Sequence, residues 1–173
     1  GNTNTVRFMT DLQGVARARW DYSSFRETYE LLLRQGDTYD WVTVTKYSER
    51  ELPELNIIAF GDDPRTAIVA SRQNSDRYAL YEFDTAARAQ GKVIFQHPTV
   101  DVGEPVGGPL YDPYTTKLVG VYYVDDLYEL SYFEPDLAKV EDKLVSTFPD
   151  VAAVEPISWS RDRSRFVVRT YGP

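Results

Sequence analysis

The sequence has no cysteine, a single histidine and no long hydrophobic run in its 173 residues. The absence of cysteine excludes disulfide bonds, cysteine-ligated zinc, iron–sulfur clusters and a thiol nucleophile. No apolar stretch approaches the roughly 18 residues of a membrane-spanning helix, and the first residues have neither the basic nor the apolar segment of a signal peptide. We therefore expect a soluble chain with no membrane contact, and these absences leave the compartment, periplasm or cytoplasm, unknown.

Positive charge is also scarce, with 19 Lys and Arg residues against 27 Asp and Glu residues and a net charge of −8. Nucleic-acid binding draws on the release of counterions by basic side chains, and an anionic membrane repels an acidic protein. Neither nucleic acid nor membrane is therefore expected as a partner. The length fits one domain, and a hydrophobic content of 42% is enough to form a core.

Hydrophobic residues alternate along much of the chain, as they do in half-buried β-strands. From Val15 to Tyr22, the apolar residues Ala16, Ala18 and Trp20 share one face and charged residues take the other. Further β-rich runs are bounded by Gly, Pro, Asp or Asn, and turns of hairpin length favour antiparallel neighbours. These strands are expected at Thr28–Arg34, Trp41–Tyr47, Asn56–Phe60, Thr66–Ser71, Tyr78–Phe83, Lys92–Gln96, Lys117–Val124, Glu129–Phe133, Ile157–Ser160 and Arg165–Tyr171.

One segment near the C-terminal end interrupts this pattern of strands. After Glu134 and Pro135, apolar residues recur at helical spacing up to Pro149, and acidic residues lie in the first turns. This pattern predicts one amphipathic helix of about three turns at Asp136–Phe148. We expect its apolar stripe to pack on the neighbouring strands.

Three similar segments indicate an internal repeat. Each has an apolar residue, an aspartate-centred turn and a β-rich run, and the turn residues Asp63, Asp112 and Asp162 are 49 and 50 residues apart. This period, with four short strands per unit, is typical of a β-propeller blade; accidental similarity between the turns of a β-sandwich is the alternative. We predict an all-β fold, a partial β-propeller of four-stranded antiparallel blades, about three and a half in number, with one inserted amphipathic helix. The expected blades are residues 6–52, 55–102, 106–154 and, in part, 155–173.

The order of several short motifs gives a family resemblance. The motifs are GGPLYDPYT at 107–115, LVGVYY at 118–123, YFEPDLA at 132–138 and ISWSRD at 157–162. In this order they resemble the N-terminal propeller of bacterial serine peptidases of the prolyl oligopeptidase family, which includes dipeptidyl and acylaminoacyl peptidases. The resemblance covers about residues 55–171 and, more loosely, the first blade.

In that family the propeller lies over an α/β-hydrolase domain and admits only short peptides to a Ser-Asp-His triad. The resemblance implies that this chain is a fragment, the non-catalytic propeller portion of a serine peptidase that gates oligopeptide access to a separate hydrolase domain. The chain has no G-x-S-x-G nucleophile motif and its only histidine is His97, so no catalytic residue is carried over. We expect no catalytic activity from the chain alone and no cofactor.

Other titratable residues have simple interpretations. His97 lies at the end of an expected strand with no evident nucleophile or orienting carboxylate, and we interpret it as a turn histidine. The pairs Asp62–Asp63 and Asp125–Asp126 are candidates for glycoside hydrolysis or calcium binding, but adjacent strand residues point to opposite faces. We therefore interpret both pairs as turn residues and assign no metal ligand.

Glycine and aromatic residues are the remaining candidates for a ligand site. Gly103, Gly107 and Gly108 do not match the G-x-G-x-x-G pattern of phosphate-binding loops. Aromatic residues make up 14% of the chain, and they either fill the space between blades or line a peptide or sugar groove. We expect three of them between the blades, with a ligand groove as the alternative: Trp20, Trp41 and Trp159.

The peptidase propeller is the leading hypothesis for function, and two others stay open. One is a free-standing β-rich binding module that holds a peptide, a sugar or a protein partner on exposed Tyr and Trp side chains. The other is a glycosidase built on a propeller, which needs two carboxylates on different blades about 5–10 Å apart. Because an open set of blades leaves strand edges unpaired, we also expect two copies to form a homodimer through these edges.

Overall fold

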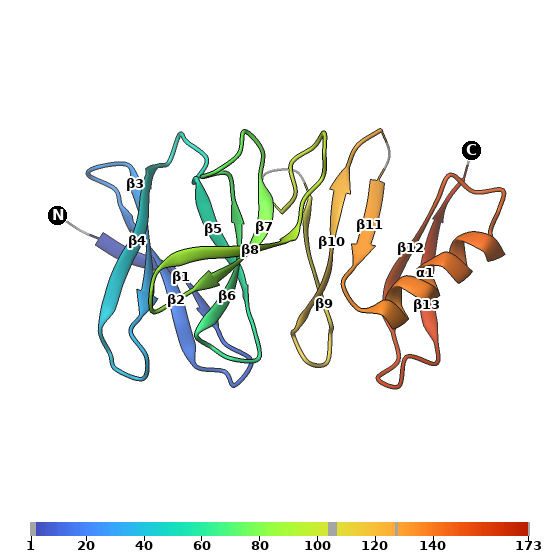
Figure 1. Cartoon of the computed structure of the whole chain (residues 1–173), viewed down its shortest axis with the longest axis horizontal. Helices are drawn as coiled ribbons and strands as arrows, with labels where there is room; N and C mark the ends of the chain where they lie inside the picture. The colour runs from blue at the N-terminus through green and yellow to red at the C-terminus, as the bar shows by residue number, and fades with distance from the viewer. Residues whose placement is uncertain (1–2, 104–106, 127, 173) are drawn as a thin grey trace.

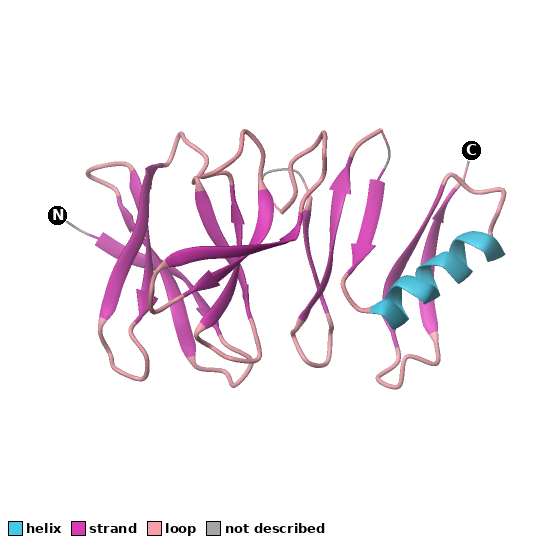
Figure 2. Cartoon of the chain, viewed as in Figure 1, coloured by secondary structure: helices cyan, strands magenta, loops and turns pink. Residues whose placement is uncertain are grey.

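The computed structural model describes residues 3–103, 107–126 and 128–172. The chain forms four antiparallel sheets that follow one another along the sequence and stand side by side (Figure 1). Within each sheet, neighbouring strands are consecutive in sequence. Among the described residues one segment is α-helical, and it lies beside the last sheet (Figure 2).

The first two sheets have four strands each, the third has three and the fourth has two. The first sheet contains β1 (Thr3–Thr10), β2 (Ala16–Ser23), β3 (Thr28–Arg34) and β4 (Trp41–Ser48). The second contains β5 (Leu55–Phe60), β6 (Thr66–Ser71), β7 (Ala79–Asp84) and β8 (Ala89–Phe95). The third contains β9 (Gly108–Tyr111), β10 (Leu118–Val124) and β11 (Tyr128–Tyr132), and the fourth contains β12 (Ala153–Trp159) and β13 (Phe166–Tyr171).

The largest hydrophobic core lies between the first and second sheets. Trp20 of β2 and Leu31 of β3 are directly opposite each other in the first sheet, and both are buried. Ile57 of β5 and Val69 of β6 belong to the same buried cluster and are paired in the second sheet. The alternation of apolar and polar residues thus gives each sheet a face that packs on its neighbour, with about 1.5–3 kcal/mol from each large side chain removed from water.

Two further cores lie between the later sheets. Leu80 of β7, Val102 in the connection after β8 and Val121 of β10 are fully buried and join the second sheet to the third. Val119 of β10 and Trp159 of β12 belong to a smaller cluster between the third and fourth sheets. The sheets are therefore held in series, each by the faces that it shares with its neighbours.

Helix α1 (Pro135–Thr147) follows β11 and contacts β11 and β12. It begins after Glu134 with proline in its first turn, where the missing N–H has no hydrogen-bond partner to lose. The observed helix confirms the one predicted at Asp136–Phe148. Leu137 is its one buried residue, and it packs in the cluster that contains Trp159. The third sheet therefore has three strands and a helix beside it, in place of the four strands expected of a blade.

A mostly β chain with one helix is confirmed, but the strand count differs from the prediction. The sheets do not close into a ring, and two strands were missed, β1 and β9. The residues of β1 are almost all exposed, so its sequence lacks the alternation that marks a half-buried strand. Proline has a low propensity for strands, so Pro109 in β9 and Pro156 in β12 do not favour a strand prediction. Both strands lie at sheet edges, where the missing N–H of proline is tolerated.

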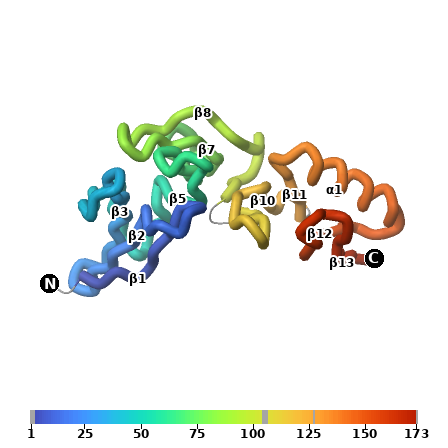
Figure 3. Tube along the Cα trace, turned by 90° about the horizontal axis from the view of Figure 1, so that it is seen from below, coloured from blue at the N-terminus to red at the C-terminus, as the bar shows by residue number. Residues whose placement is uncertain are grey.

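Seen from below, the row of sheets has two different sides (Figure 3). β8 and α1 lie along one side and β1 lies toward the other. β1, an edge strand of the first sheet, is exposed along most of its length, and β13, an edge strand of the last sheet, exposes Val167 and Tyr171. Both strands thus have one edge without a strand partner in their sheet, and the homodimer stays a prediction.

Candidate functional site

The first strands of three consecutive sheets line one cavity of about 430 Å³. Phe8 and Met9 of β1, Ile58 and Phe60 of β5, and Tyr111 of β9 form much of its wall. Cavities of roughly 300–1,000 Å³ with mainly apolar walls are typical of small-molecule and peptide-fragment sites. This cavity is therefore the best candidate for a binding site in the described part of the chain.

A second cavity of about 260 Å³ extends this site toward the fourth sheet. Tyr111 and Pro113 line both cavities, and Pro156 and Trp159 of β12 line the second. All four first strands, β1, β5, β9 and β12, thus contribute to the two cavities. We call the two cavities together the first-strand groove.

The strands that line the groove are edge strands. β1, β5 and β9 each lie at the edge of their sheet, so one side of each backbone has no strand partner within its sheet. The hydroxyl of Tyr111 donates a hydrogen bond to the carbonyl oxygen of Ile58, which ties the third sheet to the second across the groove. Edge strands of this kind pair with an extended peptide through main-chain hydrogen bonds.

The turn after each first strand is closed by an equivalent backbone hydrogen bond. The N–H groups of Asp11, Gly61, Asp112 and Ser160 each donate to a carbonyl oxygen four or five residues later, at 2.9, 2.8, 2.8 and 2.9 Å. These four residues are 48–51 positions apart in the chain. The repeat of about 50 residues is therefore a repeat of one hairpin in all four sheets.

The aspartates that revealed the repeat occupy two different positions in these turns. Asp112 and Asp11 are the residues whose own N–H closes the turn. Asp63 and Asp162 lie two residues after the closing residues of their turns, Gly61 and Ser160. In each turn a carboxylate oxygen accepts a hydrogen bond from a backbone N–H two to four residues later. The even spacing of Asp63, Asp112 and Asp162 in the sequence indicated a repeated turn. It did not include Asp11, and it did not show that Asp112 takes a different position in its turn from the other two.

Asp112 also joins the third sheet to the fourth at the rim of the groove. Its side chain is 6% exposed, and its Oδ2 lies 3.2 Å from Nη2 of Arg163, which also hydrogen-bonds Glu134 before α1. Burial alone would raise the pKa of Asp112, but the N–H groups of Tyr114 and Thr115 and the Arg163 guanidinium lower it to about 2. The carboxylate is therefore charged at neutral pH and fixes this wall of the groove.

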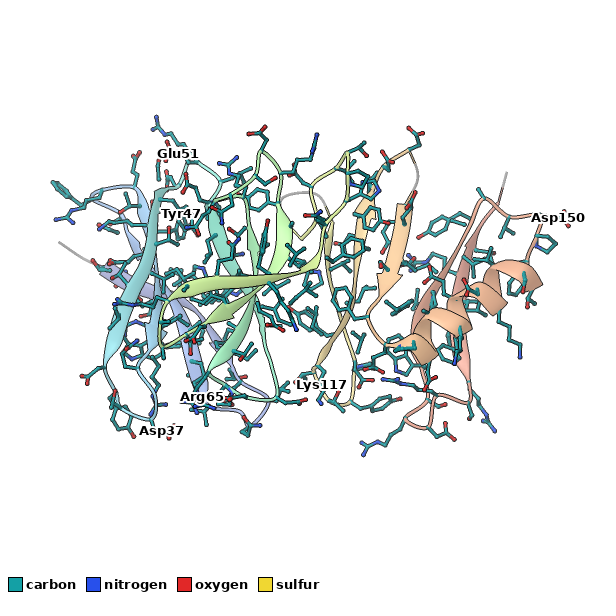
Figure 4. All side chains as sticks on the ribbon, in the orientation of Figure 1. Asp37, Tyr47, Glu51, Arg65, Lys117 and Asp150 are labelled. Carbon is teal, nitrogen blue, oxygen red and sulfur yellow. The ribbon has the colours of Figure 1, made fainter. Side chains whose placement is uncertain are left out.

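The predicted carboxylate pair Asp62–Asp63 is divided between two partners. Oδ1 of Asp62 lies 2.6 Å from Nζ of Lys117 in the turn between β9 and β10, whereas Oδ2 of Asp63 lies 2.7 Å from Nη2 of Arg65. Lys117 and Arg65 lie at the same edge of the row of sheets (Figure 4). The two aspartates thus form structural ion pairs in the turn after β5. The other pair, Asp125–Asp126, is exposed in the turn after β10.

His97 lies just after β8, and its ring packs at a tilt against Tyr123 with 4.9 Å between the centroids. Its Nδ1 is 3.2 Å from Oγ1 of Thr99, and the described residues show no carboxylate bonded to the imidazole. Gly103 and Gly107 have φ angles of 91° and 105°, but a strand follows them, so no phosphate-binding turn before a helix is formed. Among the described residues no group of three or more His, Asp or Glu side chains is arranged to hold a metal ion.

The three tryptophans do not come together in the structure. Trp20 is buried between the first and second sheets, and Trp159 lies in the core between the third and fourth sheets and lines the groove. Trp41 is half-buried on the other face of the first sheet, where its ring meets Phe8 at 6.2 Å and the Arg19 guanidinium at 4.9 Å. Only Trp159 is therefore placed to touch a ligand in the groove.

Arg7 lines the larger cavity of the groove, and the sequence did not predict it as a site residue. It is exposed on β1, and its guanidinium carbon lies 4.6 Å from the centre of the Trp20 ring. The two residues are opposite each other on β1 and β2. Because β1 was not predicted as a strand, no sequence pattern placed Arg7 beside a cavity.

Glu141 is a half-buried carboxylate on the inner side of α1. It lines a cavity of about 290 Å³ between the helix, β11 and β12. Desolvation and the neighbouring Asp142 raise its pKa to about 7. A charged Glu141 therefore weakens the packing of the helix on the third and fourth sheets.

We expect Glu141→Gln to raise the free energy of unfolding by about 1 kcal/mol at pH 8, after allowance for partial exposure. The folded pKa lies above the value of 4.5 for an unperturbed glutamate, so the destabilisation is complete above about pH 7 and vanishes below about pH 4.5. Urea unfolding at pH 8 and pH 4 measures this difference, with the exposed Glu51→Gln as the control. An equal gain at both pH values would contradict the account.

Comparison with protein-family models, curated proteins and solved structures finds no match to the chain. No helix in the described part of the chain is long and apolar enough to cross a bilayer. The case for function therefore depends on the geometry and chemistry of the first-strand groove. The groove offers apolar walls, open strand edges and two exposed arginines, Arg7 and Arg169, and these features can bind a ligand without covalent chemistry.

Proposed function

We propose that the chain is a partial β-propeller that binds short peptides in its first-strand groove and does not cleave them. In this proposal it is the propeller portion of a prolyl oligopeptidase-like serine peptidase, and the groove selects oligopeptides for a separate α/β-hydrolase domain. The observation that supports it most is the lining of one groove by the first strands of consecutive, face-to-face sheets.

The arrangement of the sheets supports the propeller part of this proposal. Propeller blades are small antiparallel sheets in series, and their first strands line a central channel. Here four consecutive sheets share buried faces, and the turn after each first strand has the same closing hydrogen bond. The first strands of this open row line the groove, and the first strands of a closed propeller line its central channel.

The chemistry of the groove supports a peptide as the ligand. The wall supplies apolar side chains for residues of a peptide, and the edge strands supply backbone donors and acceptors. A nucleic acid would meet a net charge of −8 and one unpaired arginine in the groove, which is a poor electrostatic match. A short extended peptide matches both features of the wall.

Isothermal titration of the chain with N-acetyl-Ala-Ala-Phe tests this proposal. We expect saturable binding and, in mass spectra of the same samples, intact peptide after prolonged incubation. Tyr111→Ala removes an exposed aromatic wall residue that lines both cavities, and it should weaken binding about fivefold or more. Phe25→Ala is the matched control, because Phe25 is 85% exposed and lies outside the groove. Absence of binding, or an equal effect of both variants, would refute the groove as the site.

A free-standing binding module is the second candidate, and the groove favours it because all its walls belong to this chain. The two candidates differ in what a fused hydrolase domain does. If the chain is a peptidase propeller, a downstream hydrolase domain of that family should cleave the peptides that the groove binds. If the chain is free-standing, the fusion should show no selection for those peptides. The glycosidase hypothesis gains no support, because Asp125–Asp126 is one exposed pair.

A further inference from the structure

The first-strand groove has an uneven distribution of charge. Its charged wall residues are Arg7 and Asp112 in the larger cavity and Glu155 and Arg169 in the smaller one. Asp112 is held by Arg163, and Glu155 lies 3.6 Å from Arg169, so these charges are compensated. Within the described residues, Arg7 makes no ion pair or hydrogen bond that would compensate its charge. It is therefore the uncompensated charge of the groove, in a protein whose net charge is −8.

The position of Arg7 is suited to a carboxylate. Its guanidinium carbon lies 4.6 Å from the centre of the Trp20 ring. A guanidinium packed by its face on an aromatic ring keeps the N–H donors around its edge available for hydrogen bonds to a ligand. Trp20 is buried, which gives the arginine a rigid support. A planar guanidinium held in this way makes two parallel hydrogen bonds to a carboxylate. The arginine is thus preorganised for a planar anion at the groove wall.

We propose that the groove recognises the C-terminal end of a peptide, with the terminal carboxylate on Arg7 and an apolar terminal side chain against the wall formed by Met9, Ile58 and Phe60. This inference rests on the proposed function and names the class of peptide that the site takes. The apolar residues and Arg7 line the same cavity, of about 430 Å³, which suits a ligand of two or three residues. Charge complementarity selects the carboxylate over a neutral or basic end.

Three peptides separate this inference from the proposed function. They are N-acetyl-Ala-Ala-Phe, its C-terminal amide, and N-acetyl-Ala-Asp-Phe amide, which carries a carboxylate on a side chain only. We expect the free acid to bind about tenfold more tightly than either amide, because a charged hydrogen-bonded pair is lost in both. We also expect the preference to decrease as salt is added. If no peptide binds, the proposed function itself is wrong.

Variants of Arg7 assign the preference to this residue. Arg7→Gln should bind the acid and its amide equally, whereas Arg7→Lys should keep part of the preference because it keeps the charge. Arg72→Gln is the matched control, since Arg72 also stacks on a buried ring, that of Tyr78 at 5.4 Å, but lies outside the groove. Circular dichroism checks that each variant is folded.

Two results would overturn the inference while leaving peptide binding intact. One is equal affinity of the wild-type chain for the acid and the amide, and the other is a preference that persists in Arg7→Gln. Tight binding of the aspartate-containing amide would show that Arg7 takes side-chain carboxylates, and the assignment to the C-terminal end would be wrong.

Discussion

Trp20→Ala should lower the free energy of unfolding by about 3–5 kcal/mol, the largest loss that we expect from a single substitution. Trp20 is 4% exposed in the cluster that joins the first and second sheets, opposite Leu31 on β3. Removing the indole leaves a cavity between two rigid sheets, and it also removes the support beneath Arg7. The expected loss is large because the first and second sheets pack face to face around Trp20.

Urea unfolding followed by far-UV circular dichroism measures this loss, and Trp41→Ala is the control. Trp41 is equally large but only half-buried, on the other face of the first sheet, so its removal should cost about 1 kcal/mol. Similar losses for the two variants would show that the first sheet is not packed on the second by the Trp20 face.

Asp112→Ala should lower the free energy of unfolding by about 3 kcal/mol, because it removes several bonds at one buried site. The carboxylate accepts N–H bonds from Tyr114 and Thr115, each at 2.9 Å, and pairs with Arg163. Without it the turn after β9 keeps its closing backbone bond but loses the bonds to the carboxylate, and the fourth sheet loses an ion pair with the third. Asp162→Ala, in an exposed turn, is the control and should cost less.

The lowered pKa of Asp112 predicts that the free energy of unfolding decreases at acid pH. Its pKa of about 2 in the folded protein lies below the value of 3.8 for an unperturbed aspartate. Its stabilisation is therefore complete above about pH 4 and is lost as the pH falls through about 2, with a total of about 2 kcal/mol. Unfolding curves at pH 5 and pH 2.5 should differ less for Asp112→Ala than for the wild type. An identical pH dependence of the two proteins would contradict the role of Asp112.

Local patterns in the sequence predicted most strands and the helix. The alternation around Trp20 and the apolar residues of β6 and β10 mark buried faces, and burial of those faces is what holds the sheets together. The regular spacing of Asp63 and Asp112 predicted a repeated hairpin, because aspartate stabilises turns wherever the chain reverses. These features depend on residues close together in the chain.

The site was less accessible to sequence reasoning, since it is formed by strands about 50 residues apart. β1 and β9 were missed because one is exposed and the other contains Pro109, and both line the groove. Arg7 therefore had no predicted neighbour, and its stacking on Trp20 appears only when β1 pairs with β2. A search for arginines opposite aromatic residues on neighbouring strands would have found it.

Nuclear magnetic resonance titration of the ¹⁵N-labelled chain with N-acetyl-Ala-Ala-Phe tests the central claim, that the first strands form a peptide-binding groove. The account predicts saturable shifts of backbone amides in β1, β5 and β9 and of the Trp20 indole, with little change in β4, β8 and α1, which do not line the larger cavity. Shifts confined to β4, β8 or α1, or no saturable shift at millimolar peptide, would contradict it.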